Sequence, residues 1–240
     1  MPDRDLPPRI EDRLIVALDV PDVGEARALV DRLDGVVSFF KLGLWLAFAA
    51  GFDGLVEELR RRGKRIFLDA KLYDIGETVR EGAARAAERG VTFLTVHGDA
   101  EIMRAAVAGR AGAPLKIFAI TVLTSLDERG LADLGATRPV EELVRRRARL
   151  AVECGVDGII AAPRDNPDEI RRLAGSDRLL VATPGVRLAG HASDDHKRAG
   201  TPRQAIAAGA DYLVVGRPII RSPDPAEAAR LIIEDMRSAA

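Results

Sequence analysis

Charged residues interrupt an apolar segment near the middle of the chain, IFLDAKLYDIGET, residues 66–78. Asp69 and Lys71 are two residues apart, so in an extended strand their side chains point to the same face. Lys41 lies in FFKLG, within the apolar run that precedes this one along the sequence. Because a buried charge is costly unless it is paired, the cluster indicates either a structural ion-pair network or a catalytic site.

The residues around this cluster leave further alternatives open. A second cation beside the first is unfavourable unless anions compensate for it, so Lys41 favours a site for an anionic substrate. Asp74 is the third charge of the segment, but DIGE also fits a helix N-cap with Glu77 as its capping-box partner. Asp19 and His97 each end an apolar run. Asp19 fits a simple strand end, and His97 fits a buried core histidine better than a general base.

Two glycine–arginine segments late in the chain suit phosphate binding. Residues 184–187 are PGVR and residues 216–218 are GRP, and each follows an apolar run. Glycine lets backbone N–H groups approach phosphate oxygens, and arginine offers bidentate hydrogen bonds. Two ordinary glycine turns with surface arginines are the alternative. The polar segment 188–200, LAGHASDDHKRAG, lies between them and fits either a lid or a surface loop.

Eight short apolar runs predict the strands that hold these residues. Segments with helical spacing separate the runs, and several end at a glycine suited to a helix C-cap. Near-continuous apolar strands alternating with helices are typical of a parallel sheet, and eight repeats in 240 residues favour an α/β fold of the (β/α)8 TIM-barrel type. In such barrels the active site lies at the carboxyl ends of the strands. The runs are LIVALD (14–19), VVSFFKLG (36–43), RIFLDAK (65–71), FLTVHG (93–98), KIFAITV (116–122), GIIAA (158–162), LLVATPG (179–185) and YLVVGRP (212–218).

The whole chain is interpreted as one barrel domain, residues 1–240, with 1–12 as an N-terminal extension. Stretches 126–134 and 140–154 predict two helices in one connection, and no linker rich in proline and serine marks a second domain. The basic run RRRAR, 145–149, is predicted to be a solvated helix face because acidic residues precede it at pairing distance. No function is assigned to it.

Composition narrows the class of partner. The chain has 36 Lys and Arg against 37 Asp and Glu, a formal net charge of −1, so no overall field favours nucleic acid or an anionic membrane. The single cysteine, Cys154, permits no internal disulfide, and the first residues resemble neither a signal nor a transit peptide, which predicts a cytoplasmic protein. The longest apolar stretch, from Leu42, is far shorter than the roughly 20 residues that span a bilayer. Three histidines without close partners argue against zinc, whereas magnesium held by oxygen ligands stays open.

The motifs together resemble one known family. DAKLYDIGETV resembles the signature of the orotidine 5′-phosphate decarboxylase family, and the similarity continues in order through LIVALDV, FFKLG, TVHG, TVLTS, TPGVR and DYLVVGRPI. The resemblance implies a homodimeric barrel with shared active sites that converts orotidine 5′-monophosphate to uridine 5′-monophosphate and carbon dioxide. It further implies a step of de novo pyrimidine synthesis that uses neither a metal nor an organic cofactor.

The resemblance also implies roles for the charged cluster. Lys71 would stabilise the charge that develops at C6 of the substrate and protonate that carbon, with Asp69 beside the departing carboxylate. Lys41 and Asp19 would bind the ribose hydroxyls and hold the charge network. Asp74 would reach into the partner subunit's site and complete an alternating array with Lys41, Asp69 and Lys71.

Further residues would bind the substrate away from C6. Ile75 and Thr78 would enter the partner's site beside Asp74, and Thr124 would contact the pyrimidine. The residues expected at the phosphate side are Pro184, Arg187, His196, Gly216 and Arg217.

The chain departs from the family pattern at two places. The family usually has DIPNT where this chain has DIGET, so Gly76 replaces proline and loosens the backbone of the loop. The family usually has glutamine in the lid where His196 stands here, and we expect His196 to contact the phosphate in its place.

Two other functions compete with this interpretation. A keto-gulonate-phosphate decarboxylase or a hexulose-phosphate synthase also carries an Asp-x-Lys-x-x-Asp motif but uses magnesium. Gly76 favours these enzymes. Lys41 argues against them, because these otherwise similar enzymes have an acidic residue at the position of Lys41. A catalytically silent barrel that only binds a nucleotide phosphate is the second rival.

Overall fold

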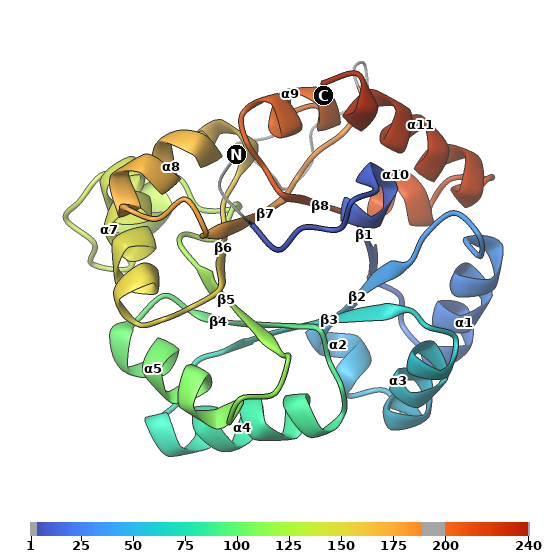
Figure 1. The fold of residues 1–240 in the computed structure, drawn as a ribbon, viewed down its shortest axis with the longest axis horizontal. Helices are drawn as coiled ribbons and strands as arrows, with labels where there is room; N and C mark the ends of the chain where they lie inside the picture. The colour runs from blue at the N-terminus through green and yellow to red at the C-terminus, as the bar shows by residue number, and fades with distance from the viewer. Residues whose placement is uncertain (1–3, 189–199, 240) are drawn as a thin grey trace.

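The computed structural model describes residues 4–188 and 200–239. Eight parallel strands, each hydrogen-bonded to the next and β8 to β1, close into a barrel that the helices surround (Figure 1). The predicted (β/α)8 fold is therefore confirmed. The strands are β1 (Leu14–Leu18), β2 (Phe39–Gly43), β3 (Arg65–Leu72), β4 (Phe93–His97), β5 (Lys116–Ile120), β6 (Gly158–Ile160), β7 (Leu180–Pro184) and β8 (Tyr212–Val215).

The helices cover the outer face of the barrel. The two helices predicted between β5 and β6 are present as α6 and α7. Within the described residues no helix has the length and apolar character needed to cross a membrane. The helices are α1 (Val23–Arg32), α2 (Leu44–Ala47), α3 (Phe52–Arg61), α4 (Gly76–Glu88), α5 (Ala100–Gly109), α6 (Glu128–Asp133), α7 (Val140–Glu153), α8 (Pro167–Ala174), α9 (Pro202–Ala207), α10 (Arg217–Ile220) and α11 (Pro225–Arg237), with the 3-10 helices η1 (Ile10–Arg13) and η2 (Pro163–Asp165).

The N-terminal segment crosses one end of the barrel before β1 begins (Figure 1). Leu6 packs against the side chains inside the barrel, and Asp5 pairs with Lys116 at 2.6 Å at the start of β5. These contacts lie at the amino ends of the strands. The described part of the predicted extension thus covers the barrel end opposite the carboxyl ends of the strands.

Aromatic side chains fill the barrel below its carboxyl end. Phe39, Phe67, Phe93 and Phe118 come from four consecutive strands, and the rings of Phe93 and Phe118 have centroids 4.4 Å apart. Strand side chains alternate between faces, so the residue two positions further along each strand also points inward, one layer closer to the carboxyl end. Those residues are Lys41, Asp69, Thr95 and Ile120. An aromatic floor of buried side chains therefore lies directly beneath the layer that holds Lys41, Asp69 and Thr95.

Candidate active site

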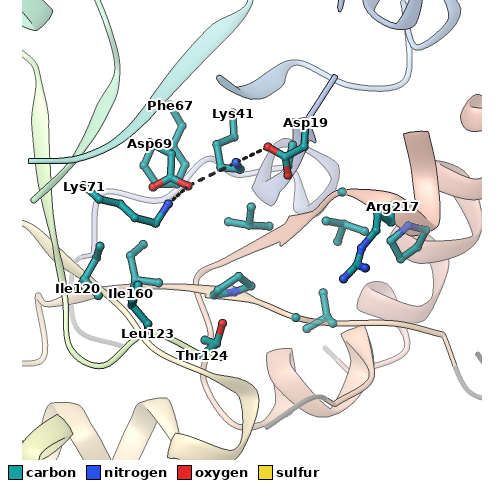
Figure 2. A pocket seen from close by; sticks show the side chains of 18 of the residues that line it. Asp19, Lys41, Phe67, Asp69, Lys71, Ile120, Leu123, Thr124, Ile160 and Arg217 are labelled. Atoms are coloured by element: carbon teal, nitrogen blue, oxygen red, sulfur yellow. Dashed lines mark hydrogen bonds and ion pairs between the residues drawn. The ribbon is translucent and has the colours of Figure 1, made fainter. Parts of the chain in front are cut away.

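A cavity of about 670 Å³ opens at the carboxyl ends of the strands, above the aromatic floor. Its walls include every residue of the charged cluster except Asp74, together with both glycine–arginine segments (Figure 2). The predicted site residues that line it are Asp19, Lys41, Asp69, Lys71, Thr124, Pro184, Arg187, Gly216 and Arg217. The structure therefore brings together residues that span almost 200 positions of the sequence.

Four charged side chains form a row of alternating sign across one wall of this cavity. Lys41 Nζ lies 2.9 Å from Oδ1 of Asp19 and 3.3 Å from Oδ2 of Asp69. Lys71 Nζ lies 2.8 Å from the same Oδ2 of Asp69. The predicted array consisted of Lys41, Asp69, Lys71 and Asp74. Within one chain, the observed row starts with Asp19 and contains the first three of these residues. Each interior charge of the row has an opposite charge on both sides.

This pairing keeps the buried members of the row ionised. Burial alone would raise the pKa of Asp69, but Lys41, Lys71 and a hydrogen bond from Thr95 together lower that pKa below its usual value. Burial alone would lower the pKa of Lys41, but Asp69 and Asp19 raise it above its usual value. Both groups are therefore charged at neutral pH, although each residue as a whole is less than a tenth exposed.

The strand that carries Asp69 and Lys71 is irregular at this point. β3 pairs with β4 through Leu68 and Leu94, and next through Leu72 and Val96. Lys71 has a φ of 49°, in the left-handed region that residues other than glycine seldom adopt. Backbone strain of this kind is often found at functional sites. The two charged side chains still converge, as the period of two along the strand predicted.

Arg217 stands away from this row of charges. Figure 2 shows Arg217 on the opposite side of the cavity from Lys71, with Asp19 between them. Arg187 follows β7 and lines the same cavity, and its backbone N–H donates to the carbonyl of Gly200 at 3.0 Å. The cavity thus has a lysine–carboxylate wall and an arginine side.

Apolar side chains line the cavity near Lys71. Phe67, Ile120, Leu123 and Ile160 line the cavity on the same side as Lys71 (Figure 2). Low polarity there strengthens the electrostatic interaction between Lys71 and any bound negative charge.

Three predicted site residues lie outside the cavity. Asp74, Ile75 and Thr78 are exposed, and Ile75 keeps 71% of its surface accessible. None of the three lines the cavity of its own chain within the described residues. His196 falls outside the described residues, so its role stays a prediction.

The capping box predicted for Asp74 is wrong. Helix α4 begins at Gly76, its N-cap is Ile75, and no side chain caps it. Asp74 Oδ1 instead accepts a hydrogen bond from the N–H of the adjacent Ile75 at 2.7 Å. Glu77 reaches forward to Arg80, 2.6 Å away, rather than back to the N-cap. The local sequence fits a cap, but the helix starts one residue later than that cap requires.

The interpretation of RRRAR as a solvated face is also wrong in part. Arg145 pairs with Glu141, as the spacing predicted. Arg147, however, is partly buried and donates a hydrogen bond of 2.6 Å to the carbonyl of Thr121 at the end of β5. Arginine is long enough to leave the helix face and reach a backbone acceptor, which charge patterning alone does not reveal.

His97 lies beside the cavity rather than in its lining. Its ring packs against Tyr73, with centroids 4.7 Å apart. Burial, Arg147 and Lys71 lower its pKa, so the imidazole is neutral at pH 7. This half-buried position agrees with the structural interpretation of His97 better than with a general base.

Sequence reasoning missed Thr95 on β4. Its hydroxyl donates to Oδ1 of Asp69 at 2.8 Å and accepts from the N–H of Lys71 at 3.0 Å. The position of Thr95 could have indicated this contact. Thr95 follows Phe93 by two residues, so it points inward as Phe93 does, and its strand lies next to the strand that carries Asp69.

The barrel and the charged cavity at the carboxyl ends of its strands place this chain among the (β/α)8-barrel enzymes. A family model described as orotidine 5′-phosphate decarboxylase / HUMPS family matches residues 12–232. The chain belongs to this family, and the resemblance drawn from its motifs is confirmed.

Similar proteins carry the same name over nearly their full length. An orotidine 5′-phosphate decarboxylase of Rhodopseudomonas palustris (strain BisB5) is 49% identical over 232 residues, which cover 97% of each chain. One from Methylobacterium radiotolerans is 49% identical over 225 residues, covering 94% of this chain and 96% of the other. The crystal structure of orotidine 5′-phosphate decarboxylase from Lactobacillus acidophilus superposes with a TM-score of 0.81 at 33% identity, covering 94% and 99% of the two chains.

Proposed function

We propose that this protein decarboxylates orotidine 5′-monophosphate to uridine 5′-monophosphate and carbon dioxide, a step of pyrimidine synthesis. The observation that carries the proposal is the alternating row Asp19, Lys41, Asp69, Lys71 in a cavity whose far side holds Arg217. The names of the similar proteins support it.

The chemistry of this reaction suits fixed charges. When the bond between C6 and the carboxylate breaks, its electron pair stays on C6, where no carbonyl or imine can accept it. Covalent electron-sink catalysis is therefore not available, and electrostatic stabilisation is the remaining route. An ammonium placed at C6 interacts more strongly with the transition state than with the substrate, which lowers the barrier.

Lys71 is the group we assign to C6. Its ammonium stabilises the developing carbanion and then transfers a proton to that carbon, and the neutral amine regains a proton from water. Asp69, 2.8 Å from Lys71, lies beside the carboxylate that departs. Lys41 balances the negative charge of Asp69 and, with Asp19, meets the ribose hydroxyls.

The arginine side of the cavity takes the phosphate in this proposal. Arg187 and Arg217 provide charge-assisted hydrogen bonds, and Pro184 and Gly216 line the same cavity. Thr124 contacts the pyrimidine. Binding energy gained at the phosphate positions the ring against Lys71, so remote contacts contribute to the rate.

A second subunit completes the site. Asp74, Ile75 and Thr78 are exposed beside the cavity of their own chain and are assigned to the cavity of a partner. The large exposed apolar side chains Trp45, Phe48 and Tyr73 lie on the same carboxyl side, consistent with a surface covered by another copy. The proposed assembly is a homodimer with shared active sites.

The magnesium-dependent members of the wider class are disfavoured by the position of Lys41. Its ammonium sits between Asp19 and Asp69, where a divalent cation would need those carboxylates as ligands. Within the described part of the chain, no group of three or more His, Cys, Asp and Glu side chains is arranged to hold a metal ion.

The direct test is an assay of the purified protein with orotidine 5′-monophosphate, in EDTA and separately in magnesium, following formation of uridine 5′-monophosphate. We expect full turnover in EDTA. Loss of turnover on chelation with recovery in magnesium would favour the sugar-phosphate enzymes. Binding of uridine 5′-monophosphate without any turnover of the substrate would favour a silent barrel.

A further inference from the structure

The hydroxyl of Thr95 joins two neighbouring parts of the charged row. Thr95 is fully buried on β4, and its inward direction follows from Phe93 two residues earlier. Its Oγ1 donates to Oδ1 of Asp69 at 2.8 Å and accepts from the backbone N–H of Lys71 at 3.0 Å. A hydroxyl can donate and accept at the same time, so one side chain serves both bonds.

The bond from the N–H of Lys71 to Thr95 replaces a strand hydrogen bond that the irregular pairing of β3 and β4 removes. Between the pairs Leu68 with Leu94 and Leu72 with Val96, the three residues 69–71 of β3 face the single residue Thr95. A bulge of this kind takes backbone groups out of the regular ladder. The N–H of Lys71 is one of them, and the hydroxyl of Thr95 accepts it in place of a strand carbonyl.

The first bond sets the orientation of the Asp69 carboxylate. Thr95 binds Oδ1, which leaves Oδ2 for both lysines, at 3.3 Å from Lys41 and 2.8 Å from Lys71. Rotation of the carboxylate would move Oδ1 away from Thr95 and Oδ2 away from the two lysines. The hydroxyl therefore fixes both the backbone that carries Lys71 and the carboxylate that holds its ammonium.

We propose that Thr95 is a positioning residue for the reaction, because its hydroxyl locks the bulge of β3 and the Asp69 carboxylate in the geometry that presents Lys71 to the substrate. The part of this inference that concerns turnover rests on the proposed function. Thr95 itself does not line the cavity. Its effect on catalysis is exerted through Asp69 and Lys71.

The matched pair of variants is Thr95→Val, which keeps the shape and removes the hydroxyl, and Thr95→Ser, which keeps the hydroxyl. We expect Thr95→Val to lower kcat about 10- to 100-fold, the effect of a small misplacement of a catalytic group, while KM changes by less than about threefold. Phosphate binding, on the far side of the cavity, explains the unchanged KM. Thr95→Ser should retain kcat within about threefold of the wild type because both hydrogen bonds can form.

Thr92→Val is the control. It removes another threonine hydroxyl that forms a hydrogen bond between the same two strands. The hydroxyl of Thr92, just before β4, accepts from the N–H of Ile66 at 3.2 Å, near the amino end of the barrel. It touches no member of the charged row. We expect kcat of Thr92→Val to match the wild type, and an equal loss in Thr92→Val and Thr95→Val would assign the effect to the strands in general.

A second measurement needs no substrate. The pKa of Asp69 can be followed by NMR of its labelled carboxyl carbon. This pKa depends on the hydrogen bond from Thr95, on Lys71 of β3 and Lys41 of β2 and, through Lys41, on Asp19. We expect that pKa to rise in Thr95→Val and to stay at the wild-type value in Thr95→Ser and Thr92→Val. If Thr95→Val does not fold, Thr95→Ala removes the same hydroxyl without adding a methyl group and replaces it in both measurements.

The two measurements separate the inference from the function on which it rests. If the wild type does not decarboxylate orotidine 5′-monophosphate, the proposed function fails, and the Asp69 titration still decides whether Thr95 holds the carboxylate. Wild-type kcat with an unshifted Asp69 pKa in the valine variant would overturn the inference. Equal impairment of the serine and valine variants would also overturn it, because the hydroxyl would then not be the decisive group.

Discussion

Asp69 and Lys71 lie two residues apart on β3, and Nζ of Lys71 is 2.8 Å from Oδ2 of Asp69. The two side chains differ in exposure: that of Asp69 is 13% accessible and that of Lys71 is 41% accessible. A purely structural buried pair gains most when both charges are enclosed and fully hydrogen-bonded. Here the ammonium faces an open cavity, so it can meet a negative charge on a ligand without losing its partner.

This relationship leads to the first prediction, for Lys71→Ala. Removing the ammonium should lower kcat at least about 10²- to 10³-fold, the scale measured when one preorganised group of an active site is removed. Steady-state kinetics with orotidine 5′-monophosphate measure the effect. Lys116→Ala is the matched control, because Lys116 pairs with Asp5 at the opposite end of the barrel and should leave kcat unchanged. Near-normal turnover of Lys71→Ala would remove Lys71 from the mechanism.

The arrangement of the barrel and most of its site could be predicted from the sequence. Apolar runs bury themselves on both faces of a parallel strand, so their number and spacing predicted the fold. The polar residue that ends each run marks the carboxyl edge, and Asp19, Lys41 and Arg217 all line the cavity for that reason. These features depend on periodicity along the chain.

The features that sequence missed depend on contacts between elements. The bulge opposite Thr95 is a register shift between two strands, and neither strand carries a glycine or proline there to signal it. Helix α4 begins at Gly76 without a side-chain cap, and the Asp74 carboxylate accepts from the N–H of the adjacent Ile75 instead, which the local pattern did not indicate. Arg147 reaches the carbonyl of Thr121, a residue 26 positions earlier in the chain.

The second prediction concerns pH and the buried part of the row. In the folded protein the pKa of Asp69 lies below its ordinary value of 3.8. Around and below that pH, Asp69 therefore binds more protons in the unfolded chain than in the folded protein. The stability contributed by the ionised carboxylate is complete above its unfolded pKa and is lost as pH falls through the lower folded pKa. Lys41→Met removes a partner of Asp69, so the pKa of Asp69 should rise and this contribution should shrink.

Urea unfolding of Lys41→Met and the wild type measures this change. We expect the variant to be less stable at pH 7 by about 3 to 5 kcal/mol, the cost of breaking a buried pair, with a smaller difference once the pH falls below about 4. Lys116→Met, whose partner Asp5 is 89% exposed, should lose at most about 1 kcal/mol at pH 7. A Lys41→Met difference that does not change with pH would contradict the linkage to Asp69.

The third prediction tests the arginine side of the cavity. Arg217→Ala should lower kcat/KM for orotidine 5′-monophosphate about 10- to 100-fold, since charge-assisted hydrogen bonds to the phosphate are lost. The nucleoside orotidine, which lacks the phosphate, should be affected far less. The ratio of the two losses is the informative quantity, because equal losses on both substrates would place Arg217 elsewhere in the reaction.

The fourth prediction concerns the residue that lies outside its own cavity, Asp74. If Asp74 acts in the partner's site, Lys71→Ala and Asp74→Ala should each be inactive alone but complement each other when subunits exchange. One site of each mixed dimer then has an intact Lys71 from one chain and an intact Asp74 from the other. An equal mixture should recover about a quarter of the wild-type activity.

A mixture of Lys71→Ala and Asp69→Asn is the control for this complementation. Both residues belong to the same wall of a single chain's cavity, so every site in a mixed dimer keeps one defect and no activity should return. Recovery in both mixtures would indicate that activity comes from something other than shared sites. Absence of recovery with Asp74→Ala, in a mixture shown by mass to contain mixed dimers, would mean that Asp74 does not complete the neighbouring site, and the row of charges would then end at Lys71.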